Sequence, residues 1–170
     1  MLKIPAKKIS YSSLPRDYSA VRFIVIHYTA GRGDTAENEG NYFKNVNDRK
    51  AGAHFFIGQD GTVVKSVDLN RTAWSVGGSK YSSCRKTGGG VLYGICTNAN
   101  SVSIELCDNV DKDPSQEQIK AVKQTIKFIR KYCPRAKTVI RHFDVTGKAC
   151  PARMVKADKW AKFKQDIGEK

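Results

Sequence analysis

The chain has 170 residues, 40% of them hydrophobic, so it is long enough to bury a core without needing disulfides to hold it together. It contains no apolar run near the ~20 residues of a membrane span, and its N-terminus lacks the apolar stretch and cleavage site of a secretory signal. Thirty Lys and Arg against 16 Asp and Glu give a formal charge of +14, which favours a polyanionic partner such as nucleic acid, an anionic membrane surface or an acid-rich cell wall.

The first 50 residues predict one strand and one helix after an irregular start. Residues 1–20 form a basic N-terminal segment without a clear period. The apolar, β-branched run VRFIVIHYTA at 21–30 has the length of a strand that is covered on both faces. A helix is predicted over 36–47, with Asp34 or Thr35 as its N-cap. Its apolar positions are Tyr42, Phe43 and Val46.

The middle of the chain predicts a hairpin, a long loop and a further strand. HFFIGQDGTVVKSV at 54–67 has two β-rich arms, and Asp60-Gly61 between them is expected to supply the positive φ angles of a tight turn. Residues 77–100 are rich in Gly, Ser, Tyr and Asn without a period, which indicates a surface loop. SVSIELC at 101–107 is the next predicted strand.

The C-terminal third alternates helix, strand and helix. A helix is predicted over about 114–132, with an apolar stripe on one side and lysines opposite. The stripe consists of Ile119, Val122, Ile126 and Ile129. A short strand is predicted at 138–143 and an amphipathic helix at 156–167. No repeat or linker divides the chain, so the alternation predicts a single α/β domain over 1–170, with one mixed β-sheet flanked by helices.

The five cysteines form an odd set without a CxxC pair: Cys84, Cys96, Cys107, Cys133 and Cys150. A disulfide framework is not expected in a chain without a secretory signal, and most of these residues are predicted to be buried free thiols. Cys84 and Cys96 flank a polar, glycine-rich stretch, and they are a pair that oxidation could join.

Two of the three histidines lie at the ends of predicted strands. His27 ends FIVIH and His142 ends VIRH, and the ends of adjacent strands are where ligands and metals collect in an α/β sheet. Cys150 follows His142 by eight residues. Two imidazoles and one thiolate are a zinc-ligand set of the kind that leaves the fourth position open for water. The alternative interpretation is that the histidines are hydrogen-bonded core residues and the cysteine a small apolar one.

Five short segments follow one another in a fixed order along the chain. They are IVIHYTAG, AGAHFFIGQDGTVV, RTAWSVGG, NSVSIEL and RHFDVTGKACP. Together they resemble the type 2 family of N-acetylmuramoyl-L-alanine amidases, which includes phage lysozyme-like amidases, bacterial wall-recycling amidases and animal peptidoglycan recognition proteins. The similarity runs over about 21–163, nearly the whole chain, although each segment alone is a weak signal.

The resemblance implies a ligand set and two catalytic residues. In this family the first histidine, the late histidine and a Cys or Asp eight residues beyond it bind zinc, which assigns one zinc ion to His27, His142 and Cys150. The family's glutamate in the strand S-I-x-I-E falls on Glu105, and its lysine two residues before the last ligand falls on Lys148. A carboxylate beside the metal can move a proton from water to the leaving amine, and a cation can stabilise the oxyanion, so both roles are chemically reasonable.

The chain departs from some relatives of this family in two places. The phage lysozyme-like members and the recognition proteins have a tyrosine just before the first polar residue of the hairpin, where this chain has Ala53 followed by His54. This difference shifts the burden of proton transfer onto Glu105 and leaves His54 as a candidate substrate-binding or structural residue. Many relatives have a histidine after the tryptophan of RTAWSVGG, where this chain has Ser75. Trp74 is expected to line the groove and stack on a sugar or stem residue, with core packing as the alternative.

The resemblance implies zinc-dependent hydrolysis of the amide between N-acetylmuramic acid and L-alanine in peptidoglycan, as in a phage endolysin. Such a chain is expected to be a monomer, made in the cytoplasm without membrane insertion, that reaches the wall after release. A cytosolic amidase that recycles soluble muropeptides is the alternative. A non-catalytic peptidoglycan-binding module is disfavoured because such relatives lose the ligand at Cys150. Nucleic-acid binding is suggested by charge alone, and no motif supports a specific nucleic-acid partner.

Overall fold

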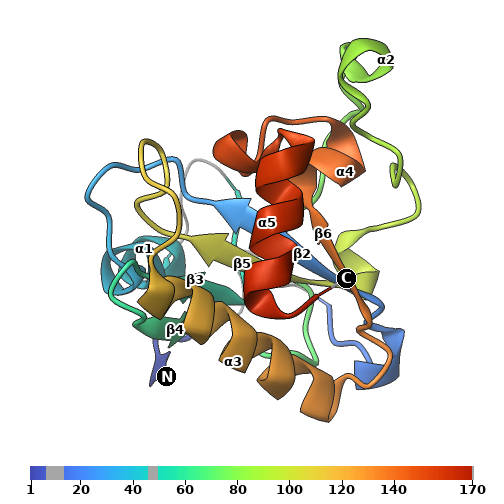
Figure 1. The fold of residues 1–170 in the computed structure, drawn as a ribbon. Helices are drawn as coiled ribbons and strands as arrows, with labels where there is room; N and C mark the ends of the chain where they lie inside the picture. The colour runs from blue at the N-terminus through green and yellow to red at the C-terminus, as the bar shows by residue number, and fades with distance from the viewer. Residues whose placement is uncertain (7–13, 46–49, 170) are drawn as a thin grey trace.

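Six strands form one mixed sheet in the order β1-β4-β3-β5-β2-β6. The structure is a computed structural model that describes residues 1–6, 14–45 and 50–169. The strands are β1 (Leu2–Lys3), β2 (Phe23–Tyr28), β3 (Phe55–Ile57), β4 (Val63–Lys65), β5 (Ser101–Leu106) and β6 (Thr138–Arg141). The four strands β3, β5, β2 and β6 are parallel, whereas β4 is antiparallel to β3 and carries β1 parallel to itself. The predicted class, α/β with a single mixed sheet, is confirmed (Figure 1).

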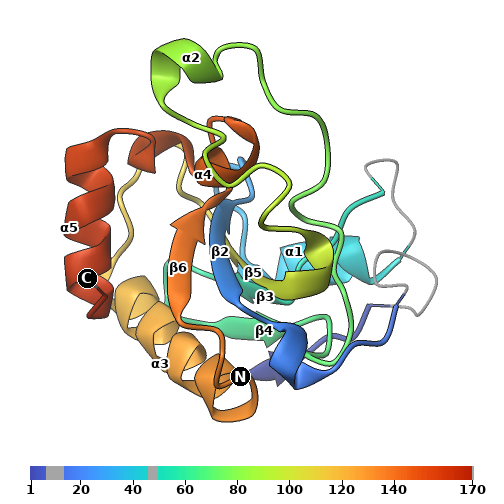
Figure 2. The ribbon, with the colours of Figure 1, turned by 90° about the vertical axis from the view of Figure 1, so that its right-hand side faces the viewer.

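Helices cover both faces of this sheet. Figure 2 shows α3 (Gln116–Tyr132) and α5 (Ala157–Ile167) on one face and α1 (Ala36–Lys44) on the other. Two shorter helices, α2 (Cys84–Thr87) and α4 (His142–Thr146), lie beyond the carboxyl end of β6. Within the described part of the chain, no helix combines the length and the apolar character that crossing a membrane requires.

The side chains of β2 point alternately to the two faces of the sheet and so belong to two separate parts of the core. Ile24 and Ile26 belong to the large apolar cluster under α3 and α5, whereas Phe23 and Val25 belong to a cluster on the other side. Successive side chains of a strand point to opposite faces. His27 therefore lies on the side of the sheet away from α3 and α5.

The first predicted strand and helix are both present with shorter bounds. The strand expected at 21–30 is β2, and the helix expected at 36–47 is α1. Thr35 is the N-cap, because its hydroxyl accepts a hydrogen bond from the backbone N–H of Asn38. Of the expected apolar positions, Phe43 is buried, Tyr42 is exposed and Val46 lies outside the described residues.

The predicted hairpin at 54–67 is confirmed as the antiparallel pair β3 and β4. The turn differs from the prediction, because only Gly61 has a positive φ (82°) and Asp60 does not. The Asp60 carboxylate instead accepts hydrogen bonds from the backbone N–H of Thr62 (2.9 Å) and from its hydroxyl (2.8 Å). This residue therefore shapes the turn through its side chain rather than through its backbone angle.

The N-terminal segment 1–20 is less irregular than predicted. Leu2–Lys3 forms the edge strand β1, which pairs with β4, and Tyr18–Ala20 form a single 3-10 turn. Sequence patterning could not show a two-residue strand, since alternation needs at least four residues to be recognised.

The predicted strand at 138–143 is wrong at its end. The strand β6 stops at Arg141, and His142 is the first residue of α4 rather than the last of a strand. Asp144 explains the change, because its carboxylate accepts a hydrogen bond from the backbone N–H of Arg141 (2.8 Å) and so caps the new helix.

The two C-terminal helices are confirmed as α3 and α5. The predicted apolar stripe of α3 is buried along its whole length. The predicted loop at 77–100 is irregular except for α2 and a 3-10 turn, Asn98–Asn100. All five cysteines are buried free thiols, so Cys84 and Cys96 are not joined.

Candidate metal centre

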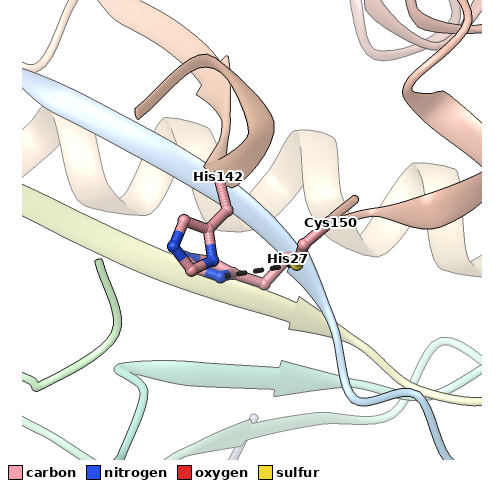
Figure 3. Close-up of side chains that lie close together, drawn as sticks. All are labelled: His27, His142 and Cys150. Atoms are coloured by element: carbon pink, nitrogen blue, oxygen red, sulfur yellow. Dashed lines mark hydrogen bonds between the residues drawn. The ribbon is translucent and has the colours of Figure 1, made fainter. Parts of the chain in front are cut away.

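Three side chains from separate segments meet at the carboxyl end of the parallel strands. His27 comes from β2, His142 from the start of α4, and Cys150 from the turn that follows α4. Their possible ligand atoms all lie within 4.8 Å of one another, and all three residues are buried. Figure 3 shows the two imidazole rings close together. Their centroids are 4.7 Å apart and their planes are tilted by 56°, and the Cys150 sulfur lies 3.8 Å from Nδ1 of His27.

A tight return of the backbone brings His142 and Cys150 together. Helix α4 ends at Gly147, which has a φ of 84° and donates its N–H to the carbonyl of Phe143 (2.9 Å). Three residues later, the N–H of Cys150 donates to the carbonyl of Lys148 (2.7 Å). The carbonyl of Cys150 then accepts from the N–H of Phe143 (2.9 Å). The segment from His142 to Cys150 thus folds back on itself, and Gly147 supplies the left-handed turn.

Strand register places Glu105 beside this cluster. His27 on β2 is paired directly with Glu105 on β5, so both side chains point to the same side of the sheet. The Glu105 carboxylate lies 3.9 Å from Nδ1 of His27, and its side chain keeps 17% of its surface exposed. A carboxylate in this position is close to the cluster and still reachable from solvent.

The cluster opens into a cavity of about 460 Å³. Lys148 lines it and is exposed, and Trp74 lines another wall with 41% of its surface exposed. The other lining residues are His27, Tyr28, Thr29, Ala30, Phe43, Ala51, Gly52, Ser75, Glu105, His142 and Cys150. Six of the seven candidate site residues from the sequence therefore share one cavity.

Comparison with known proteins identifies the family of this chain. The family described as N-acetylmuramoyl-L-alanine amidase matches residues 17–153, which is most of the chain. The chain belongs to this amidase family. Its curated relatives include the N-acetylmuramoyl-L-alanine amidase BlyA of Bacillus subtilis (strain 168), which is 29% identical over 98% of this chain and 46% of BlyA. The amidase CwlL of Bacillus licheniformis is 28% identical over 81% of this chain and 38% of CwlL. The chain thus spans less than half the length of each of these two relatives.

Solved structures agree on the fold. PlyL superposes with a TM-score of 0.74 at 20% identity, covering 98% of this chain and 96% of PlyL. The catalytic domain of XlyA superposes with a TM-score of 0.71 at 23% identity, covering 98% of each chain. The six-stranded sheet and its helices are therefore an amidase-family catalytic-domain fold.

Burial determines the protonation of His27, His142 and Cys150. It lowers the pKa of His142 to about 4, with the charge of Lys148 adding to the effect. The pKa of His27 lies well below its ordinary value for the same first reason, with His142 and Lys148 contributing. Both rings are therefore neutral at pH 7, which is the form that binds metals. Burial, together with the Glu105 charge, raises the pKa of the Cys150 thiol to about 12, while the backbone N–H of Tyr28 and the charge of Lys148 oppose the shift.

The residues of the cluster fit a zinc ion. Among the residues that the structure describes, no hydrogen-bond partner exists for Nε2 of His27 or for either ring nitrogen of His142. Buried polar atoms are normally paired, so several unpaired ring nitrogens at one place indicate a missing ligand. The possible ligand atoms of the three residues all lie within 4.8 Å of one another, so one small ion could contact all three, and two imidazoles with one thiolate are a donor set that suits zinc. Within the described ranges, no fourth His, Cys, Asp or Glu joins this group.

His54 lies apart from the cavity that the other candidates share. Its ring is fully buried, and Nδ1 accepts a hydrogen bond from the backbone N–H of Ser103 (3.1 Å). Nε2 lies 3.1 Å from the carbonyl of Arg71 and 2.9 Å from the guanidinium of Arg16. Burial and the Arg16 charge hold the pKa of His54 well below its ordinary value. This neutral ring links β5 to the segment around residue 71, and it does not line the cavity.

Sequence reasoning missed several residues of the cavity wall. Tyr28, Thr29 and Ala30 directly follow His27, so their place at the strand end was a usable signal. Ala51 and Gly52 carry no such signal. They reach the cavity because the N–H of Gly52 donates to the carbonyl of Trp74 (3.1 Å), a contact between segments that a single sequence does not reveal.

Proposed function

We propose that this chain hydrolyses the amide bond between N-acetylmuramic acid and L-alanine in peptidoglycan, with one zinc ion held by His27, His142 and Cys150. The observation that carries the proposal is the meeting of these three buried side chains with Glu105 and Lys148 around one cavity. Membership of the amidase family and the names of relatives such as BlyA and CwlL support the choice of substrate.

Each polar residue of the cavity has a distinct role in this proposal. When bound, zinc supplies a Lewis acid that polarises the amide carbonyl and lowers the pKa of water. Glu105, next to His27 and partly exposed, accepts the proton of the attacking water and passes it to the leaving amine. Lys148 donates to the carbonyl oxygen as negative charge develops on it. Trp74, which lines the cavity and is 41% exposed, stacks on a sugar or stem residue.

The intact cell wall is the proposed target, as for a phage-type endolysin. The formal charge of +14 supports this choice, because it raises the rate of encounter with a wall rich in anionic polymers. A recycling amidase acts instead on soluble muropeptides. Comparing rates on intact sacculi and on soluble fragments separates the two, since a recycling enzyme is slow on sacculi.

Mass spectrometry of purified sacculi after digestion tests the reaction itself. The proposal predicts new L-alanine amino termini while the glycan bonds stay intact. New reducing sugar ends, or cuts within the stem peptide, would show a different hydrolase. The variant Glu105→Gln is the matched control, because it removes the proposed base while keeping the size of the side chain.

A further inference from the structure

Helix α3 presents a single-sign stripe of lysines to solvent. Lys120, Lys123, Lys127 and Lys131 are all exposed, and at 100° per residue they fall within an arc of roughly 80°. The arc lies opposite the buried stripe of the helix, and it extends for roughly 16 Å along the axis. The only acidic residue of α3 is Glu117, in its first turn. We call these four residues the α3 lysine stripe.

The charges of this stripe are not neutralised by the protein. Over residues 1–6, 14–45 and 50–169, no ion pair joins any of the four lysines to an acid. The neighbouring helix α5 is also rich in lysine, but two of its three lysines form ion pairs with acids. Lys159 pairs with Asp113 (2.9 Å) and Lys162 pairs with Asp166 (2.9 Å). Two adjacent helices of similar composition thus differ in the charge that they leave free.

The stripe and the cavity lie on opposite sides of the sheet. The buried residues of α3 pack in one cluster with Ile24 and Ile26, while His27 points to the other side. Figure 2 shows α3 at the outside of the molecule, with the sheet between it and α1. A polymer held by the stripe therefore leaves the cavity open.

The chemistry of the stripe selects one kind of partner. Membrane-surface helices need an exposed apolar face, and the apolar face of α3 is buried in the core. Nucleic-acid sites favour arginine forks and stacked aromatic rings, whereas the four charges of this stripe are all lysines, with one exposed ring, Tyr132, beside Lys131. Lysine is a compact point charge that suits isolated phosphates along a flexible chain.

We propose that the α3 lysine stripe binds a flexible phosphodiester polymer of the bacterial wall, such as a polyol-phosphate chain. The stripe holds the molecule at the wall while the cavity on the other side remains free for peptidoglycan. The choice of a wall polymer rests on the proposed function. The existence of an anion-binding stripe rests only on the exposed and uncompensated lysines.

The salt dependence of binding to poly(glycerol phosphate) tests the stripe. Four phosphate contacts predict that affinity falls roughly 50-fold between 50 and 200 mM salt, from a slope of about 0.7 per contact. Replacing Lys120, Lys123, Lys127 and Lys131 together by Gln is expected to lower this slope by about 3 and to weaken binding at 50 mM by at least tenfold. The matched control replaces Lys156, the N-cap of α5, and the three α5 lysines, Lys159, Lys162 and Lys164, by Gln, with the same change in net charge. The control is expected to keep the slope of the unmodified chain to within about 1.

Equal salt slopes in the two variants would refute polymer binding by the α3 lysine stripe, since net charge alone would then explain binding. Tighter binding to duplex DNA at equal phosphate concentration would overturn the choice of polymer. Hydrolysis of peptidoglycan stripped of phosphate polymer separates this proposal from the activity. The expected result is equal rates for the unmodified chain and both variants. An inactive chain that still shows the stripe-dependent slope would refute the amidase proposal and leave the stripe standing.

Discussion

At the scale of single residues, burial prepares His27, His142 and Cys150 for a cation in different ways. The two imidazoles are neutral at pH 7, so their lone pairs are available without loss of a proton. The Cys150 thiol has its pKa raised to about 12, so a thiolate there requires a nearby positive charge. Glu105 and Lys148 line the same cavity but lie outside this group of three, and their proposed roles can therefore be tested without changing the proposed zinc ligands.

Glu105→Gln is expected to lower the rate of peptidoglycan hydrolysis by about 10²–10⁴, because an amide cannot accept the proton of water. The zinc content of the variant should stay that of the unmodified chain, since Glu105 is not among the three ligands. Turbidity loss of sacculi, measured beside zinc content, checks both points. Unchanged hydrolysis in this variant would assign proton transfer to another group.

Lys148→Met is expected to lower kcat by about 10²–10³, because the carbonyl oxygen would lose the cationic donor that we propose for it. KM should change less, since this contact strengthens as charge develops. Lys156→Met is the control, because Lys156 is exposed and does not line the cavity. Equal kinetics in the two variants would remove Lys148 from the reaction.

At the scale of elements, the loop at 77–100 holds the short helix α4 in place. The N–H of Tyr81 donates to the carbonyl of Thr146 (2.8 Å), that of Gly90 to Phe143 (2.9 Å), and that of Leu92 to Asp144 (2.8 Å). A helix of five residues is not stable alone, so these bonds supply much of what keeps α4 folded. The placement of His142, the first residue of α4, therefore depends on this loop.

Gly147→Ala tests the link between this loop and the ligands. A Cβ at this position would have a strained φ and would collide with the sulfur of Cys84. We expect a loss of about 1–3 kcal/mol in unfolding free energy together with weaker zinc binding. Gly168→Ala is the matched control, because Gly168 also has a positive φ (79°) but lies at the end of α5. Calorimetric zinc titration should distinguish the two, and equal affinities would show that α4 tolerates the strain.

Sequence periodicity predicted the elements whose burial pattern repeats. The strand β2 and the helix α3 follow from their apolar patterns, while the end of β6 does not, because the Asp144 cap overrides a strand-like run. The docking of the loop at 77–100 against α4 could not be predicted from the sequence, since it uses backbone N–H donors that any residue except proline could provide. The ligand set at His27, His142 and Cys150 came from strand ends and family resemblance, and its role in binding zinc stays a prediction.

At the scale of the whole molecule, the three histidines of the chain make stability depend on pH. All three are buried, with the pKa of His142 lowered to about 4 and those of His27 and His54 lowered well below the ordinary value. The unfolded chain binds a proton at each histidine near pH 6.5, and the folded chain does not. Stability is therefore complete above about pH 6.5 and is lost as pH falls, by up to about 1.4 kcal/mol per pH unit for each group.

Urea unfolding of the chelator-treated protein between pH 7.5 and pH 4.5 checks this dependence. The free energy of unfolding should decline steadily below pH 6.5. A constant value from pH 7 to pH 5 would show that the histidines bind protons in the folded chain.

Metal content measured on active protein tests the central claim most directly. Elemental analysis of the purified chain should find about one zinc ion per molecule, and Cys150→Ala, which removes one of the three ligands, should contain far less. Chelation should abolish peptidoglycan hydrolysis, and added Zn²⁺ should restore it. A fully active preparation that contains no transition metal would contradict the account.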